Sequence, residues 1–373
     1  MKGKARSLPP KLFGVTIDSV SYITSIIDAI KEIKRSAPNV KPVVRVVFDF
    51  DEDIFKEKKY RFTERDFEAE ARRYKQAIET ISKEAFVMGE LIDSSAVYRC
   101  HYDSDDTRTY VERTKAYVRT LGDLVDIWEV GNEVNGEWVG WKEDAWEDPQ
   151  VTVEMMEVVR SRVAREIKAS FDVIKRMNAA ATTALTFYYN DDGKNHGWTN
   201  DQKRNSSGQL VRYGVNYSLL KWATDYRALL PQVDYVLLSY YEDDNQLVRP
   251  NRNDMNVDGL VTCLKQLASL FKEGTRFGFG EFGPQCHVCL DRRCQTCLSD
   301  QAEFIKRYHI GLDKTITAKL KTAENGWDRN RAYIGGYFYW YFKQDVVNQK
   351  NTKTIEAFQR AFDEWYSQRT NDE

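Results

Sequence analysis

The feature that most restricts the fold of this chain is a regular alternation of short β-rich runs with longer amphipathic runs. It continues through all 373 residues, with no Gly/Ser-rich or Pro-rich linker and no repeated sequence. Such alternation predicts βαβ units and a parallel sheet. The predicted strands cover residues 12–20, 40–50, 86–93, 125–133, 183–189, 233–241, 276–283 and 332–342. Helices are predicted after them near residues 21–36, 64–84, 106–120, 151–177, 216–229, 256–272, 299–322 and 353–368.

Eight units in a chain of this length predict an α/β fold, a (β/α)8 TIM barrel that forms a single domain over residues 1–373. A doubly wound sheet is the alternative, although it seldom contains so many regular units. The active site of such a barrel lies at the C-terminal ends of its strands. The candidate residues are therefore the polar side chains that close the strands. They are Asp18, Arg45 with Asp49, Glu90 with Asp93, Asn132 with Glu133, Tyr188 to Asn190, Tyr240 with Tyr241, Glu281 and Trp340.

Two of these residues are carboxylates with apolar or glycine neighbours. Glu133 ends the run WEVGNE on the fourth strand, and Glu281 lies in FGFGEFG on the seventh. Across the barrel mouth their carboxyl groups can approach to about 5–5.5 Å, the spacing of a retaining glycosidase. Burial beside a like charge would raise the pKa of the carboxyl that donates the proton. A lone glutamate at a strand end is more often solvated or salt-bridged, and it is the pair, with Arg45, Tyr241 and Trp340 at the same rim, that favours catalysis.

These residues, in this order, resemble clan A of the retaining glycoside hydrolases. Asn132-Glu133 and the Gly-Glu-Phe-Gly of residues 280–283 look like the clan's acid/base and nucleophile signatures, and the second is especially similar to glycoside hydrolase family 5. Arg45 in VVRVVF is similar to the strand-two arginine of that family. Trp340 in FYWYF looks like the strand-eight tryptophan that floors the sugar site.

The resemblance implies that Glu133 is the acid/base and Glu281 the nucleophile. Asn132 would hold the 2-hydroxyl of the reacting sugar. Arg45 would hydrogen-bond Glu281 and keep it ionised. Arg45 has an alternative interpretation as a charged member of the barrel interior, paired with Glu90 or Asp49.

The motif LLSYYED resembles the strand-six tyrosine of family 5 and also the endo-galactanases of family 53. Adjacent strand residues point to opposite faces, so only one of Tyr240 and Tyr241 can contact Glu281, and Tyr241 is favoured. The histidine that often precedes this tyrosine is absent, and Ser239 stands in the neighbourhood. Trp340 has a second interpretation as a core residue, because FYWYF is aromatic throughout.

A cysteine cluster follows the seventh strand and makes residues 285–298 a Cys-rich insertion. Its members, in the spacing C-x2-C-x4-C-x2-C, are Cys286, Cys289, Cys294 and Cys297. Two such knuckles are typical of a structural zinc site, and nested disulfides are the alternative in an oxidising compartment. Four protein ligands leave no open metal position, so no cofactor is expected in catalysis. The glycines of GFGEFG match a dinucleotide fingerprint, but no helix begins after them and no nucleotide site is predicted.

The loop after the fourth strand, NEVNGEWVGWKEDAWEDP, is rich in tryptophan. The rings of Trp138, Trp141 and Trp146 could stack on successive sugars or pack the loop onto the barrel. We therefore expect a polysaccharide or oligosaccharide substrate with β-linkages, cut internally rather than from an end. The alternatives are a carbohydrate-binding barrel without chemistry and a transglycosylase that uses the same site.

The charge balance bears on other partners. Lys and Arg total 55 against 57 Asp and Glu, so no binding to nucleic acid is expected. No apolar run approaches the about 18 residues of a membrane span, and no membrane partner is expected. The start MKGKARSLPPKLFGV lacks the apolar region of a signal peptide, which is compatible with a cytoplasmic chain or with a secreted or periplasmic one whose leader was removed. A monomer is expected.

Overall fold

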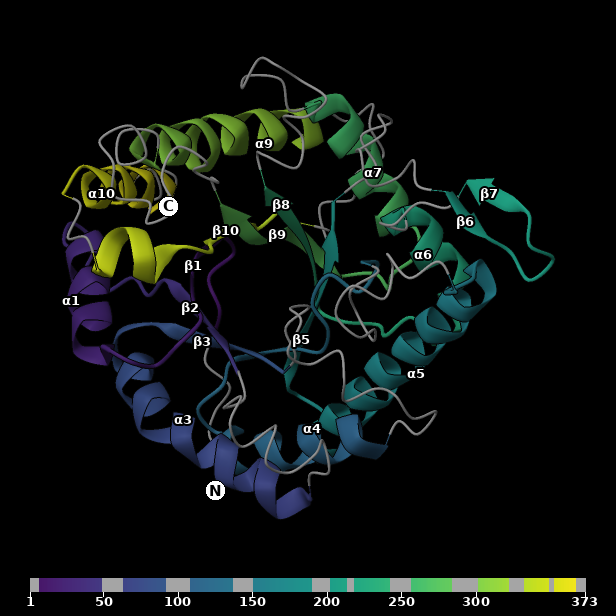
Figure 1. Cartoon of the computed structure of the whole chain (residues 1–373). Helices are drawn as coiled ribbons and strands as arrows, with labels where there is room; N and C mark the ends of the chain where they lie inside the picture. The colour runs from purple at the N-terminus through teal and green to yellow at the C-terminus, as the bar shows by residue number, and fades with distance from the viewer. Residues whose placement is uncertain are drawn as a thin grey trace.

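The structure is a computed structural model that describes residues 7–48, 63–91, 108–136, 150–189, 202–212, 218–241, 256–283, 301–321, 332–348 and 352–366. Parallel strands close into a barrel in the order β1-β10-β9-β8-β5-β4-β3-β2, and helices surround it (Figure 1). This arrangement confirms the predicted TIM barrel.

The elements agree closely with the predicted ranges. The barrel strands are β1 (Leu12–Ile17), β2 (Val43–Val47), β3 (Phe86–Glu90), β4 (Ile127–Glu129), β5 (Thr182–Tyr188), β8 (Tyr235–Tyr241), β9 (Arg276–Gly283) and β10 (Gly335–Tyr339). The α-helices are α1 (Ile23–Ile33), α3 (Glu64–Glu84), α4 (Arg108–Leu121), α5 (Val153–Met177), α6 (Leu219–Asp225), α7 (Val257–Ala268), α9 (Asp313–Lys321) and α10 (Thr352–Tyr366). Shorter helical segments are η3 (Arg227–Leu229), η4 (Lys306–Leu312) and η6 (Phe342–Val347).

An antiparallel hairpin and the helical segment η6 were not predicted. β6 (Gln202–Arg204) and β7 (Leu210–Arg212) form a separate antiparallel hairpin within the long polar segment between β5 and α6. The hairpin lies at the edge of the molecule, outside the ring of helices (Figure 1). Within the described residues, no helix is both long and apolar enough to cross a membrane.

Alternation of side chains along the strands separates two hydrophobic layers. Val44 and Val46 belong to the outer layer, which lies between the barrel and the helices. The inner layer fills the barrel from its N-terminal end. Its members are Leu12, Val43, Phe86, Met88, Ile127, Ala184, Tyr235, Leu237, Ile334 and Phe338.

The barrel interior changes from apolar to polar toward the C-terminal ends of the strands. The next inward positions on six of the strands are all buried and polar. They are Thr16, Arg45, Glu90, Glu129, Thr186 and Ser239. The fold therefore places a polar layer directly above a hydrophobic plug, with the mouth of the barrel above that layer.

The start of β10 depends on a glycine that passes close to β9. Gly336 has φ 90°, and a Cβ at this position would lie 2.0 Å from the carbonyl oxygen of Phe279. Gly208, in the turn of the β6–β7 hairpin, also has positive φ, 80°, but a Cβ there would meet nothing within 4 Å. An alanine would be strained by the positive φ at either position, but it would collide with neighbouring atoms only at position 336.

We predict that Gly336→Ala destabilises the protein far more than Gly208→Ala. A left-handed alanine costs about 1–2 kcal/mol at either position, and overpacking adds about 1–3 kcal/mol at Gly336. Denaturant unfolding of the two variants measures the difference. Equal losses of stability would contradict the close approach of β10 to β9.

Candidate active site

A β-bulge in β9 aims Glu281 into the barrel. Leu238 of β8 pairs with Phe279, but the next residue, Ser239, pairs with Glu281, so Gly280 is an extra residue in β9. Ser239 is an inward position, and Glu281 beside it therefore also faces inward. A Cβ on Gly280 would lie 2.7 Å from Leu237 Cβ and 3.0 Å from Thr186 Oγ1, so the bulge requires a glycine here.

A second irregularity follows β4 and carries Asn132 and Glu133. The amide of Thr186 donates to Gly131 O (3.0 Å), and its carbonyl accepts from Val134 N (3.3 Å). A regular parallel ladder would leave one residue between these two partners, but here both Asn132 and Glu133 lie between them. Glu133 accordingly has φ 45°, a left-handed conformation that is uncommon for a non-glycine residue. Such strain is concentrated at functional sites in proteins.

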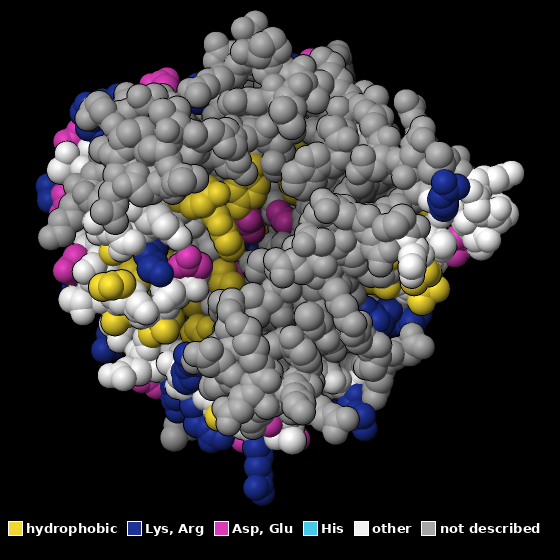
Figure 2. Space-filling view, in the orientation of Figure 1, with side chains coloured by type: hydrophobic (Ala, Val, Ile, Leu, Met, Phe, Trp, Pro, Cys, Tyr) yellow, Lys and Arg dark blue, Asp and Glu magenta, His cyan; other side chains and the backbone are white. Residues whose placement is uncertain are grey.

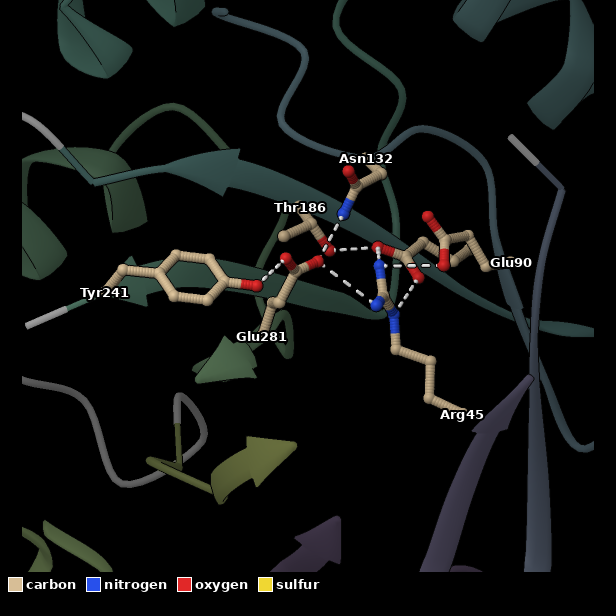
Figure 3. A network of polar contacts seen from close by, with 7 residues as sticks. Arg45, Glu90, Asn132, Thr186, Tyr241 and Glu281 are labelled. Carbon is tan, nitrogen blue, oxygen red and sulfur yellow. Dashed lines mark hydrogen bonds and ion pairs between the residues drawn. The ribbon is translucent and has the colours of Figure 1, made fainter. Parts of the chain in front are cut away.

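Three donors hold the carboxylate of Glu281 (Figure 3). The Tyr241 hydroxyl donates to Oε1, and Asn132 Nδ2 donates to Oε2 over 3.2 Å. Arg45 Nη1 also donates to Oε2, over 3.2 Å. Only 5 % of Glu281 is exposed, so these bonds replace the water that would otherwise solvate an ionised carboxylate. The arrangement stabilises Glu281 as an anion whose orientation is restricted.

Arg45 also binds two carboxylates deeper in the barrel. Its Nε lies 2.7 Å from Glu129 Oε2, and its Nη2 lies 3.0 Å from Glu90 Oε2. Thr186 donates its hydroxyl to Glu129. Arg45, Glu90 and Glu129 are all fully buried. Burial alone would lower the pKa of Arg45, but the charges of Glu129, Glu90 and Glu281 outweigh it and keep that pKa well above its usual value.

Both interpretations of Arg45 are therefore present at once, because it contacts Glu281 and pairs within the barrel interior with Glu90. Asp49, the other expected interior partner, lies outside the described residues. Glu129 was not among the candidate residues. A signal for it existed in the sequence, since Glu129 is a charged residue between apolar neighbours inside a strand, as Arg45 is.

The charges of Glu133 and Glu281 both influence the pKa of Tyr241. Burial, together with the charges of Glu281 and Glu133, raises the pKa of Tyr241 well above its usual value. Tyr241 therefore remains protonated and serves Glu281 as a hydrogen-bond donor. Only 6 % of Glu133 is exposed. The two carboxylates thus share one largely buried environment at the mouth.

The neighbouring tyrosine, Tyr240, lies on the opposite face of β8. It is buried in the outer hydrophobic layer, where its ring stacks on Phe282 at 5.2 Å between centroids and lies 6.1 Å from that of Tyr308. This position separates Tyr240 from the mouth, so the expected role in substrate binding does not fit it. The strand alternation assigns the contact with Glu281 to Tyr241.

Trp340 follows β10 at the mouth and is only partly buried. The guanidinium carbon of Arg45 lies 5.7 Å from the centre of the Trp340 ring, so this indole lies beside the polar layer. Figure 2 shows a hollow at this end of the barrel, with acidic side chains at its bottom and hydrophobic side chains along one wall. A ring in this position can support the apolar face of a sugar.

Several expected site residues lie outside the described residues. These are Trp138, Trp141 and Trp146 in the loop after β4, and Cys286, Cys289, Cys294 and Cys297 after β9. Among the residues that the structure does describe, no group of three or more His, Cys, Asp or Glu side chains could hold a metal ion. The zinc site and the tryptophan subsites stay predictions.

The one described histidine does not contribute to the mouth. His309, in η4, is fully buried and its Nε2 lies 3.1 Å from the carbonyl oxygen of Tyr337. Burial lowers the pKa of His309 to about 3, so the imidazole stays neutral at physiological pH. Ser239, which stands near the position of the absent histidine, is buried in the polar layer.

No protein-family model and no curated protein matches this sequence. Solved structures match in fold. The family 1 β-glucosidase from Thermotoga maritima in complex with isofagomine lactam has a TM-score of 0.54 and 11 % identity, covering 95 % of this chain and 99 % of that chain. The β-glucosidase from the same organism in complex with castanospermine has a TM-score of 0.54 and 11 % identity, covering 91 % and 90 %. A GH10 structure from Paenibacillus barcinonensis is more distant, with a TM-score of 0.49, 13 % identity and coverage of 94 % of each chain. At these identities the likeness shows a shared fold.

We predict that Arg45→Met destabilises the protein by about 3–5 kcal/mol, because it leaves buried carboxylates without their cation. Arg119→Met is the matched control. Arg119 also contacts two carboxylates, Glu64 and Glu68, but its side chain is 54 % exposed. Chemical denaturation should show little change for this control. A similar small effect for Arg45→Met would mean that the buried carboxylates do not need the guanidinium.

Proposed function

We propose that this protein is a retaining glycoside hydrolase that acts on β-linked polysaccharides or oligosaccharides. The observation that carries the proposal is the buried carboxylate of Glu281, held by Tyr241, Asn132 and Arg45 at the mouth of the barrel, with Glu133 beside them. Two solved structures that share the fold are β-glucosidases. The motifs that resemble clan A and family 5 support the same assignment.

In the first step, Glu281 attacks the anomeric carbon of the sugar. The bond from this carbon to the departing oxygen breaks, and Glu133 gives its proton to that oxygen. The product is a glycosyl ester on Glu281 and a free alcohol. In the second step, Glu133 removes a proton from water, the oxygen of this water attacks the anomeric carbon, and Glu281 leaves as a carboxylate. Two displacements at one carbon give net retention.

The donors around Glu281 suit the first step. A carboxylate that accepts hydrogen bonds from Arg45, Asn132 and Tyr241 is ionised and aimed before the substrate arrives. Asn132, which precedes Glu133 and donates to Glu281, can also hold the hydroxyl next to the anomeric carbon, a contact that strengthens in the transition state. Trp340 would support the ring of the reacting sugar. The proposal includes membership of family 5 and cleavage of the polysaccharide at internal linkages.

The first test is the release of reducing sugar from β-linked glucans, mannans, galactans and xylans. We expect wild type to act on one of these polymers and Glu281→Ala to be slower by about 10⁴-fold or more, as with other lost nucleophiles. Glu364→Ala, which removes a partly exposed carboxylate on α10, should keep full activity. Equal release by wild type and Glu281→Ala would remove Glu281 from the mechanism. Binding of a polymer without turnover would favour a carbohydrate-binding barrel.

The proton donor is tested with aryl glycosides. Glu133→Ala should lose most activity on substrates with poor leaving groups and much less on 2,4-dinitrophenyl glycosides, because a good leaving group needs no proton. With the latter, the alkaline limb of the pH profile of kcat/KM should disappear. Added azide should restore turnover of Glu133→Ala by yielding a β-glycosyl azide, since a small anion can enter the space left by the acid. An equal loss for all leaving groups would exclude Glu133 as the acid.

We also propose that Cys286, Cys289, Cys294 and Cys297 bind a structural zinc after β9. The purified protein should then contain about one zinc per chain. Chelation should lower the thermal midpoint without lowering kcat at temperatures where the fold persists. Cys263→Ala, which removes the buried thiol of α7, should retain the metal. Absence of zinc, together with blocked thiols in the four residues, would establish disulfides instead.

A further inference from the structure

A polar cluster at the mouth takes no part in the mechanism above. It consists of Asp18, which follows β1, with Lys343 and Gln344 of η6. Lys343 Nζ lies 3.2 Å from Asp18 Oδ1, and Gln344 Nε2 donates to Asp18 Oδ2 over 2.8 Å. The side chain of Asp18 is 36 % exposed and that of Lys343 is 18 % exposed. Two donors thus orient the carboxylate of Asp18, and part of it remains exposed to solvent.

The strand order places this cluster relative to the reacting groups. In the closed order β1-β10-β9-β8-β5-β4-β3-β2, β10 lies directly opposite β4, and β1 is next to β10. Glu133 follows β4, whereas η6 begins shortly after β10 and Asp18 follows β1. The cluster therefore stands across the mouth from Glu133.

This placement determines which part of a substrate meets the cluster. The acid must face the departing oxygen, so the leaving group lies on the β4 side. In the proposed mechanism the transferred sugar would lie over Glu281 and beside Trp340, and the next sugar toward the non-reducing end would continue toward β10 and β1. Over η6, Figure 2 shows acidic and basic side chains, with hydrophobic side chains between them and the hollow. A sugar chain that leaves the hollow toward the cluster would therefore cross an apolar surface before it reaches polar side chains.

The chemistry of the cluster suits a neutral sugar. A carboxylate oriented by two donors has remaining lone pairs that accept hydrogen bonds from neighbouring hydroxyls. Lys343 and Gln344 can donate to the same sugar. A uronic acid would meet the charge of Asp18 and be disfavoured.

We propose that Asp18, Lys343 and Gln344 form a subsite for a neutral sugar, one residue to the non-reducing side of the reacting sugar. The proposal rests on the proposed function for its direction, and it makes a disaccharide the smallest well-bound donor. Substrates that carry only one sugar on this side would leave the subsite empty.

The test compares 2,4-dinitrophenyl β-glycosides of glucose, mannose, galactose and xylose with those of the corresponding β-1,4 disaccharides. For the accepted sugar, wild type should show kcat/KM at least about tenfold higher for the disaccharide. Asp18→Ala and Gln344→Ala should each reduce this preference by about tenfold, the effect of one hydrogen bond to a charged group, and leave the monosaccharide glycoside within about twofold of wild type. The unchanged monosaccharide rate shows that each variant is folded. Asp258→Ala, which breaks a comparable lysine pair with Lys319 on the outer helices, should preserve the preference.

Two outcomes would overturn the subsite. One is equal kcat/KM for the two substrate lengths in wild type, and the other is an equal loss for both lengths in Asp18→Ala. If no aryl glycoside is hydrolysed, the proposed function fails, and the subsite is judged separately by calorimetry with free disaccharides. Disaccharide binding that weakens about tenfold in Asp18→Ala would support the subsite, and disaccharide binding unaffected by this change would exclude it.

Discussion

The polar layer at the mouth depends on the ion pairs of Arg45. One buried guanidinium contacts three glutamates that come from three different strands, β3, β4 and β9. Removing any charge from water is costly, and the guanidinium of Arg45 offsets this cost for all three glutamates. Arg45 thereby ties the deepest polar residues to Glu281. The stability of the barrel mouth and the orientation of Glu281, the most exposed of the three glutamates that Arg45 contacts, have a common origin.

The barrel itself is regular, and its candidate functional residues lie where the regularity ends. Glu281 follows the extra residue Gly280, and Glu133 occupies the extra position after β4. The two strands could not present these side chains at the mouth with an unbroken alternation. The pairs β1–β2, β2–β3, β3–β4, β4–β5 and β5–β8 keep a continuous register, whereas the register also shifts between β1 and β10. The irregular positions that carry Glu133 and Glu281 are thus separate from the regularly paired strands.

Most of the fold could be predicted from the sequence, because periodicity is a local property that each segment displays by itself. The strand that contains Arg45 and the helix at residues 64–84 are examples in which pattern and structure agree closely. Contacts between segments were harder to predict. Alternation favoured Tyr241 over Tyr240, but nothing in the sequence linked Glu129 to Arg45, since the barrel closure brings them together. The β6–β7 hairpin was missed because each of its strands has only 3 residues, which is too short to show a periodic pattern.

The extra glycine in β9 has a consequence for how such barrels diverge. Gain or loss of a single residue at this position would exchange the faces to which the following residues point, although the sequence on either side would stay the same. A barrel could then keep its hydrophobic pattern and its glutamate yet direct that glutamate into the helical layer. Active and inactive members of such a lineage would differ in segment length, and a comparison that scores only residue identity would not separate them.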